Sequence, residues 1–157
     1  MMTKLKTVPE LRFPGFDGAW WKKPLRTLSQ KSISYGIVQT GDSVEGGVKC
    51  VRVVDLTKPQ IVPDQLITTT EEISRSYKKT LLAEGEIMVA LRGNIGLVAL
   101  VPKWLEGSNL TRGIARIAPK TSEVHAQYLL WALRSNDGKA EFAKQVNGSA
   151  LKEIPIG

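Results

Sequence analysis

The sequence has one cysteine, Cys50, and one histidine, His125. A lone cysteine excludes a disulfide within the chain, and the two residues are too few for a tetrahedral Cys/His zinc site. No apolar run approaches the ~18 residues of a membrane-spanning helix. The opening residues, MMTKLKTVPELRF, lack the apolar centre of a secretion signal. These absences predict a cytoplasmic protein that does not bind a membrane.

Catalytic motifs are also missing. There is no Gly-x-Ser-x-Gly, no P-loop and no glycine-rich nucleotide motif after a strand. Asp64 followed by Glu72 resembles part of a nuclease signature, but that pattern needs a lysine where Ser74 stands. A dyad of Cys50 and His125 is the other enzymatic alternative, although Cys50 falls in a strand pattern typical of a core residue. We therefore predict no catalytic site, no cofactor and no metal in this chain.

Acidic residues are in deficit, with 15 Asp and Glu against 22 Lys and Arg and a formal charge of +7. This imbalance favours a polyanionic partner, nucleic acid ahead of an anionic membrane, with a merely soluble basic protein as the alternative. The 157 residues, 42% of them hydrophobic, are enough to bury a core. We expect one domain over residues 1–157.

The stretch GEIMVALRGNIGLVALV, residues 85–101, predicts the centre of the fold. Its two short apolar runs, Glu86–Leu91 and Ile95–Val101, favour strands buried on both faces and paired as a hairpin. Arg92, Gly93 and Asn94 are expected at a solvent-exposed tip. Turn geometry alone accounts for Gly93 and Asn94, whereas no turn requires an arginine. Arg suits guanine and Asn suits adenine, so this tip is a candidate DNA contact.

The remaining patterns predict a mixed α/β (α+β) fold: a twisted, largely antiparallel sheet with the hairpin at its centre and helices packed on it. Residues 1–24 are expected to form an irregular arm pinned to a surface by its aromatic side chains. These aromatics are Phe13, Phe16, Trp20 and Trp21. Further strands are expected within Lys31–Gly47, at Val48–Val54 and at Leu110–Ile117, the last with Arg112 and Arg116 on one face.

Two helices are predicted near the end of the chain. The first begins at Ser122 or Glu123, ends at Arg134 and is largely buried. His125 falls outside its apolar stripe, which contains Val124, Tyr128, Trp131 and Ala132 and is broadened by Leu129, Leu130 and Leu133. The second spans Lys139–Val146, is capped by Asp137 and is ended by Asn147-Gly148.

A basic cluster follows another predicted helix start. The segment Thr69–Glu72 has the form Thr-x-x-Glu, typical of a capping box. The short helix that it opens leads to Arg75, Lys78 and Lys79. A solvated charged turn is one interpretation. Because Tyr77 stands among the cations, a phosphate-binding edge with a stacking ring is the other.

Together these segments resemble one target recognition domain of a type I restriction-modification specificity subunit, over essentially the whole chain. The order and spacing of several pieces carry the resemblance. They are PELRFPGFDGAWW, Tyr35-Gly36 with Thr40, GEIMVALRGNIG, RIAP before YLLWALRS, and the closing NGSALKEIPIG. Glu86 departs from the family, which usually has Asp after the glycine that opens the hairpin. In the family a long spacer helix and a second recognition domain follow, so we expect a half-subunit that ends before that helix.

The resemblance implies a non-catalytic reader of double-stranded DNA that directs modification and restriction. Its implied partners are a DNA methyltransferase subunit, a restriction and translocase subunit, and a second specificity half. S-adenosylmethionine, ATP and Mg²⁺ are expected on those other subunits. Recognition residues vary between family members, so loop position and charge select the candidate DNA contacts. These are Tyr35, Gln39, Thr40, Arg75, Lys78, Lys79, Arg92, Asn94 and Arg112.

Two other functions stay open from the sequence. One is a protein-interaction fragment that docks on a methyltransferase subunit. The other is a general basic nucleic-acid-binding module, including one that binds RNA.

Overall fold

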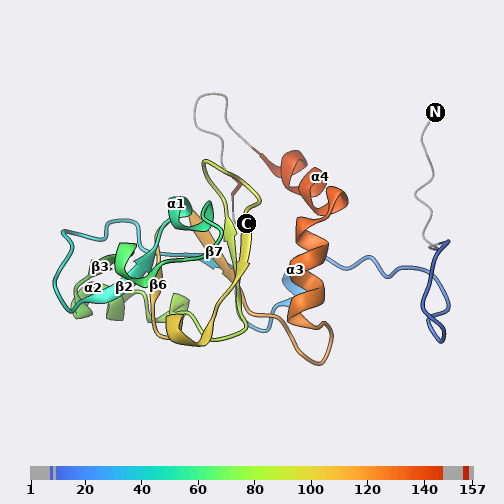
Figure 1. Ribbon diagram of the computed structural model, residues 1–157, viewed down its shortest axis with the longest axis horizontal. Coiled ribbons are helices and arrows are strands. Elements are labelled where there is room, and N and C mark those ends of the chain that lie inside the picture. The colour runs from blue at the N-terminus through green and yellow to red at the C-terminus, as the bar shows by residue number, and fades with distance from the viewer. Residues whose placement is uncertain (1–7, 9, 147–153, 156–157) are drawn as a thin grey trace.

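The strands form two sheets within the part of the chain that the computed structural model describes, namely residue 8, residues 10–146 and residues 154–155 (Figure 1). The four-stranded sheet is antiparallel throughout and consists, in spatial order, of β1 (Ser34–Tyr35), β7 (Ile114–Ile117), β4 (Ile87–Ala90) and β5 (Val98–Leu100). The three-stranded sheet consists of β3 (Ile67–Thr69), β2 (Val48–Val51) and β6 (Asn109–Leu110), with β2 antiparallel to β3 and parallel to β6. The predicted mixed class and the β4–β5 hairpin are confirmed, but the expected single sheet is divided into two.

The helices lie on opposite sides of the four-stranded sheet. In the described residues the α-helices are α1 (Val53–Leu56), α2 (Glu71–Ser76), α3 (Ala126–Arg134) and α4 (Asn136–Gln145). Short 3₁₀ turns are η1 (Leu25–Leu28), η2 (Pro63–Gln65), η3 (Lys78–Thr80) and η4 (Lys103–Leu105). In Figure 1, α1 and α2 lie with the three-stranded sheet, whereas α3 stands on the other side of the four-stranded sheet with α4 beyond it. None of the described helices is long and apolar enough to cross a bilayer.

Each face of the four-stranded sheet contributes to its own core because successive strand residues point to opposite faces. One face, with Ile87, Val89 and Ile117, packs against Leu129 and Leu130 of α3. The other face packs against the three-stranded sheet, and its core contains Met88, Ile114, Val51 and Leu110. All of β4 is buried, as expected for a strand covered on both faces.

The expected strand Leu110–Ile117 is wrong, because the chain changes sheets within it. β6 pairs with β2, β7 pairs with β4, and residues 111–113 form a turn in which the N–H of Ile114 donates to the carbonyl of Thr111 at 3.0 Å. At Gly113 an added Cβ would lie 2.7 Å from Cγ2 of Val53, so the turn passes closely against α1. Arg112 and Arg116 consequently do not share a surface: Arg112 is exposed in the turn and Arg116 is buried in β7.

The strand expected at Val48–Val54 stops at Val51, because Arg52 begins α1. The backbone N–H of Arg52 donates to the carboxylate of Asp55 at 2.8 Å, and its guanidinium donates to the same carboxylate. The start of α2 is shifted by one residue from the expected box, since Thr70 accepts from the N–H of Ile73. Between Lys31 and Gly47 only β1 forms a strand.

The aromatic residues of the N-terminal arm and of α3 were expected to pack against the protein, and this expectation is wrong. In Figure 1 the N-terminal arm extends away from α3, and its side chains are exposed: Phe13 81%, Phe16 71%, Trp20 59% and Trp21 87%. α3 begins at Ala126 and buries Leu129 and Leu130 of the predicted stripe, so the buried stripe is narrower than predicted. Tyr128 and Trp131 are 53% and 60% exposed.

The helix that follows starts earlier than predicted. Ser135 caps α4 by accepting from the N–H of Gly138 at 3.1 Å, in place of Asp137. α4 ends at Gln145, and the predicted stop at Asn147-Gly148 lies outside the described residues.

Candidate nucleic-acid interface

A buried ion pair links the four-stranded sheet to the segments that carry candidate contacts. Nη1 of Arg116, which is 2% exposed, lies 3.1 Å from Oε1 of Glu86, immediately before β4. Nζ of Lys31 donates to the same oxygen at 2.9 Å, and the N–H of Ala83 donates to Oε2 at 2.9 Å. Both oxygens of Glu86 are therefore hydrogen-bonded, which is the condition under which a buried carboxylate is tolerated.

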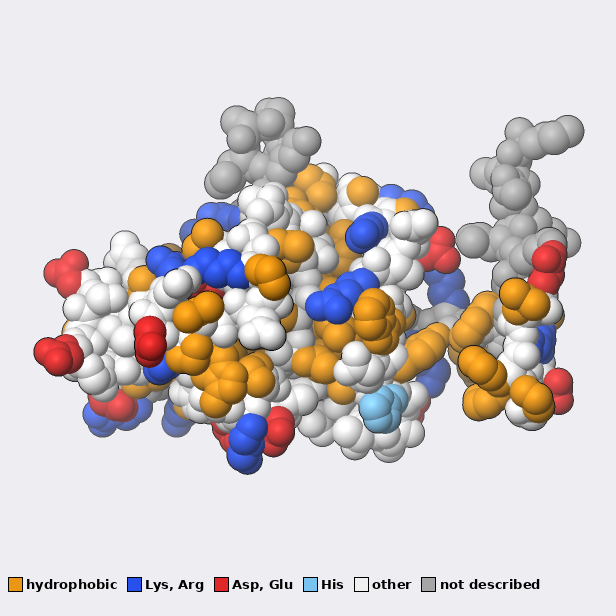
Figure 2. Space-filling view, in the orientation of Figure 1, with side chains coloured by type: hydrophobic (Ala, Val, Ile, Leu, Met, Phe, Trp, Pro, Cys, Tyr) orange, Lys and Arg blue, Asp and Glu red, His pale blue; other side chains and the backbone are white. Residues whose placement is uncertain are grey.

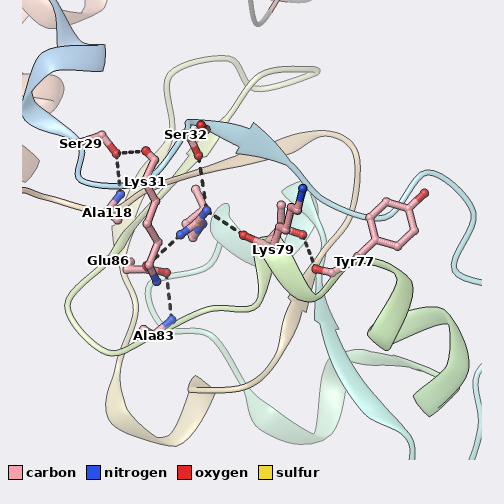
Figure 3. A network of polar contacts seen from close by, with 10 residues as sticks. Ser29, Lys31, Ser32, Tyr77, Lys79, Ala83, Glu86 and Ala118 are labelled. Carbon is pink, nitrogen blue, oxygen red and sulfur yellow. Dashed lines mark hydrogen bonds and ion pairs between the residues drawn. The ribbon is translucent and has the colours of Figure 1, made fainter.

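The same guanidinium reaches the backbone of two neighbouring segments. Nη2 of Arg116 donates to the carbonyl of Lys79 at 2.9 Å and to the carbonyl of Ser32 at 3.4 Å. Figure 3 shows these segments meeting around the buried cation, with Ser32 just before β1 and Lys79 in η3. The ion pair thus fixes the backbone of η3, whereas the side chains of Lys78 and Lys79 remain exposed.

Tyr77 ties the loop after β1 to this basic cluster. Its hydroxyl accepts from the N–H of Val38 at 3.4 Å, and its ring projects toward that loop in Figure 3. The hydroxyl of Thr69 donates to the carbonyl of Thr40 at 2.7 Å. The loop is therefore held at two points beside η3, with Gln39 exposed and Thr40 half-buried.

A second group of candidates gathers at the turn between β6 and β7. The guanidinium carbon of Arg112 lies 6.0 Å from the centroid of the Tyr35 ring, within the range of a cation–π contact. Both residues are exposed. The N–H of Arg112 donates to the carbonyl of Ile37 at 2.8 Å, and the N–H of Ile37 donates to the carbonyl of Leu110 at 2.7 Å. Backbone pairing therefore holds the turn against the residues that follow β1.

Arg92 lies beside this turn and not at an open tip. The N–H of Leu91 donates to the carbonyl of Gly113 at 2.8 Å, and a Cβ added at Gly113 would lie 3.9 Å from Cβ of Arg92. Arg92 is half-buried, so the expectation that it is fully offered to solvent is wrong. The chain reverses further on, where the N–H of Leu97 donates to the carbonyl of Asn94 at 3.3 Å. Asn94 itself is exposed.

The candidate contacts therefore form two adjoining groups joined by residues 35–40. We name Tyr35, Arg92 and Arg112 the turn group, and Gln39, Thr40, Lys78 and Lys79 the lysine group. Arg75 is exposed in the last turn of α2, before the lysine group, and Asn94 lies two residues beyond Arg92. Figure 2 shows Lys and Arg side chains spread over the surface around α1 and the visible end of β7. With a formal charge of +7, this surface is suited to a polyanion.

Sequence reasoning missed the residues that position these groups. Arg116 was expected only to share one strand face with Arg112. The acid Glu86, next to a run predicted to be buried on both faces, was a signal that a buried cation is needed. Gly36 was quoted only as part of a motif. An added Cβ there would lie 1.9 Å from the carbonyl oxygen of Leu110, so only glycine lets β1 continue alongside β6.

The structure contradicts the enzymatic alternative of a Cys50–His125 dyad. Cys50 is fully buried in β2, and burial raises the pKa of its thiol to about 11, which makes it a poor nucleophile at neutral pH. His125 precedes α3 on the opposite side of the four-stranded sheet, where it is exposed. Among the described residues, no three His, Cys, Asp or Glu side chains gather as metal ligands.

Known proteins similar to this chain are specificity subunits of type I restriction enzymes. The chain is 29% identical over 104 residues to the EcoBI specificity subunit of Escherichia coli, a match that covers 66% of this chain and 22% of that protein. The crystal structure of the type I restriction-modification S subunit from M. genitalium matches with a TM-score of 0.57 and 13% identity, over 95% of this chain and 34% of that one. No protein-family model matches the sequence.

The fold is thus that of an S subunit, and the chain forms a domain like those of type I specificity subunits. It spans about a fifth of the length of the first relative and about a third of the second. The resemblance read from the sequence is confirmed at the level of this domain.

Proposed function

We propose that this domain recognises double-stranded DNA as one half-site reader of a type I restriction-modification complex and catalyses no reaction itself. The observation that carries the proposal is that the two groups lie on adjoining anchored segments joined by residues 35–40. The turn group offers the guanidinium of Arg112 and the ring of Tyr35 to base edges, while the lysine group offers ammonium groups to phosphates. Phosphate contacts set the register on DNA and base contacts set the sequence, so a reader needs both.

The partners follow from this role. The domain would direct a DNA methyltransferase subunit and a restriction and translocase subunit in the cytoplasm, together with a second specificity half. S-adenosylmethionine, ATP and Mg²⁺ would be used by those subunits and not by this chain.

The test is duplex DNA binding by fluorescence anisotropy across a salt series. Each phosphate contact should contribute ~0.9 to the slope of log affinity against log salt. We expect Lys78→Ala/Lys79→Ala to weaken binding to all sequences and to lower this slope by about one to two. The matched control is Lys139→Ala/Lys144→Ala on α4, which removes the same charge on the other side of the four-stranded sheet. An equal loss in both double variants would mean that net charge alone drives binding.

Competition between duplex DNA and duplex RNA of equal length addresses the general nucleic-acid-binding alternative. Preference for the DNA is expected, because side chains cannot read bases in the deep, narrow major groove of RNA. Equal competition by RNA would favour the general module.

One observation favours a docking role in addition. On α3, Tyr128 and Trp131 are mostly exposed, and the guanidinium of Arg134 lies 5.4 Å from the Trp131 ring centroid. Tyr, Trp and Arg are the residues that most often carry binding energy at protein interfaces. We propose that this helix surface contacts the methyltransferase subunit. Trp131→Ser should weaken co-purification of that subunit while leaving DNA binding unchanged, and loss of DNA binding instead would contradict the assignment.

A further inference from the structure

The turn between β6 and β7 has the features of a rigid presenting loop. It is closed by the hydrogen bond from Ile114 to Thr111 at 3.0 Å, and its second residue, Arg112, is paired through its N–H with Ile37 at 2.8 Å. Its third residue is Gly113, which is packed against Val53. Both ends of the turn enter strands of different sheets, so its backbone is held from two sides.

Arg112 projects from this fixed backbone with its guanidinium over the ring of Tyr35. The distance from the guanidinium carbon to the ring centroid is 6.0 Å, and Tyr35 is 45% exposed. A ring on one side of a guanidinium restricts its rotamers but leaves the N–H groups in its plane available for hydrogen bonds. The ring therefore orients the guanidinium so that its N–H groups can donate side by side to one acceptor edge.

Other arginines of the described chain are occupied differently. Arg116 is buried and bonded to Glu86, and Arg52 is bonded to Asp55 and to the carbonyl of Gln65. Arg134 donates to the carbonyl of Val98. Arg134 also lies over an aromatic ring, 5.4 Å from the Trp131 centroid, but on α3. Arg112 combines exposure and an aromatic neighbour with the lysine group close by along residues 35–40 to hold phosphates.

We propose that Arg112 reads a guanine in the major groove and that Tyr35 is the positioning residue that orients it. The inference rests on the proposed function and deepens it by naming the base and the reader. A planar guanidinium can donate two parallel hydrogen bonds to O6 and N7 of guanine, an arrangement that no other base offers at the same edge. The ring of Tyr35 reduces the freedom that the side chain loses on binding.

The experiment is selection of bound duplexes from a randomised library by the full chain at low salt, followed by affinities for the enriched site and for its single-base variants. The wild type should enrich a guanine at one position, with a preference of roughly 5- to 150-fold over the other bases. Arg112→Lys keeps the charge but not the planar fork. It should lose most of this preference while keeping affinity for random DNA and the salt slope.

Two substitutions at Tyr35 separate its ring from its hydroxyl. Tyr35→Phe retains the ring and should retain the guanine preference, whereas Tyr35→Leu should reduce the preference several-fold and leave the salt slope unchanged. Retained preference in Tyr35→Leu, or equal losses in both variants, would overturn the positioning role. Thermal unfolding should be nearly unchanged in all three variants, because both residues are exposed.

The outcomes distinguish this inference from the function on which it rests. If wild-type protein binds DNA but Arg112→Ala keeps the guanine preference and weakens every sequence equally with a lower salt slope, Arg112 contacts phosphate. The inference then fails and the proposed function stands. If the wild type binds no duplex even at low salt, both fail.

Discussion

The two faces of the four-stranded sheet are closed in different ways. The face toward the three-stranded sheet is sealed by Met88 and Ile114 and by the buried pair of Arg116 and Glu86. Among the described residues, the face toward α3 is bordered by a cavity of about 760 Å³ whose lining includes Ala115 and Phe142. We name these the sealed face and the open face. The lysine group is attached on the side of the sealed face, where Arg116 donates to the carbonyl of Lys79. Tyr35 of the turn group pairs with Ala115 and so lies on the side of the open face.

The largest effect is expected from breaking the ion pair of the sealed face. Arg116→Met leaves the carboxylate of Glu86 buried without its buried cation and should lower the free energy of unfolding by ~3–5 kcal/mol. It also removes the hydrogen bonds to Lys79 and Ser32, so DNA binding should weaken as η3 loosens. Urea unfolding measures the first effect and anisotropy the second.

A second variant isolates the unpaired charge. Arg116→Met combined with Glu86→Gln should recover part of the lost stability, because the amide can still accept from the N–H of Ala83 without a buried charge. Lys103→Ala is the surface control, since its ion pairs with Glu84 and Glu106 are exposed and should contribute little to stability. A double variant no more stable than Arg116→Met would argue against an electrostatic cause.

A matched pair of methyl additions compares the faces directly. Ala90 is fully buried and lies on the same face as Met88, whereas Ala115 lines the cavity. Ala90→Val should overpack the sealed face and cost ~1–3 kcal/mol of unfolding free energy. Ala115→Val should cost less than Ala90→Val, because Ala115, although 1% exposed, borders the cavity. Thermal and urea unfolding of the two variants test this, and equal costs would mean that the faces are packed alike.

Because Cys50 is buried, on the side of the sealed face, the free energy of unfolding should fall at alkaline pH. Burial raises the pKa of this thiol to about 11 in the folded chain. The unfolded thiol ionises near ~8.5, so only the unfolded state loses its proton between these values. The contribution is complete below the unfolded pKa and is lost as pH rises, by about 1 kcal/mol near pH ~9.5. The difference in unfolding free energy between wild type and Cys50→Ala should fall over this range, and a constant difference would contradict the burial.

The smallest effect is expected on the outer surface of α3. Trp131 is 60% exposed, so Trp131→Ser should change the free energy of unfolding by no more than ~0.5 kcal/mol. A larger loss would mean that its contact with Arg134 supports the helix more than its exposure indicates. Urea unfolding beside wild type at neutral pH is sufficient for the measurement.

The sequence predicted those parts of the fold that depend on local patterns. The hairpin of β4 and β5 follows from two short apolar runs, and the start of α2 follows from a threonine and the residues just after it. The break at residues 111–113 is not visible locally, because LTRGIARI has strand-forming residues throughout. Pairing with β2 on one side and β4 on the other decides where the strand ends. α1 was missed for a related reason, since its two valines favour a strand until Asp55 accepts from the N–H of Arg52.

The candidate interface was predictable in composition and less so in arrangement. Charge and loop position selected Arg112 and Tyr35 separately, and only the structure brings them within 6.0 Å. Arg92 was chosen as a tip residue, yet the turn lies three to four residues further on, where Gly96 adopts a φ of +83°. The buried stripe of α3 was predicted too broad, since Leu129 and Leu130 are buried but Tyr128 and Trp131 are exposed. Such errors arise where a helix is apolar on most sides.

The turn at residues 111–113 also has a mechanical consequence. The chain crosses between the two sheets several times, and here it does so in three residues, whereas the crossing from β1 to β2 uses twelve. Because this connection is short, β6 and β7 can move little relative to each other where they meet it. Any rotation of one sheet against the other would therefore be centred near this turn. In such a rotation Arg112 would be displaced least, and the lysines of η3, which lie farther from the turn, would be displaced more. Such a lever would keep the sequence-reading side chain still while the phosphate contacts follow a duplex as it bends.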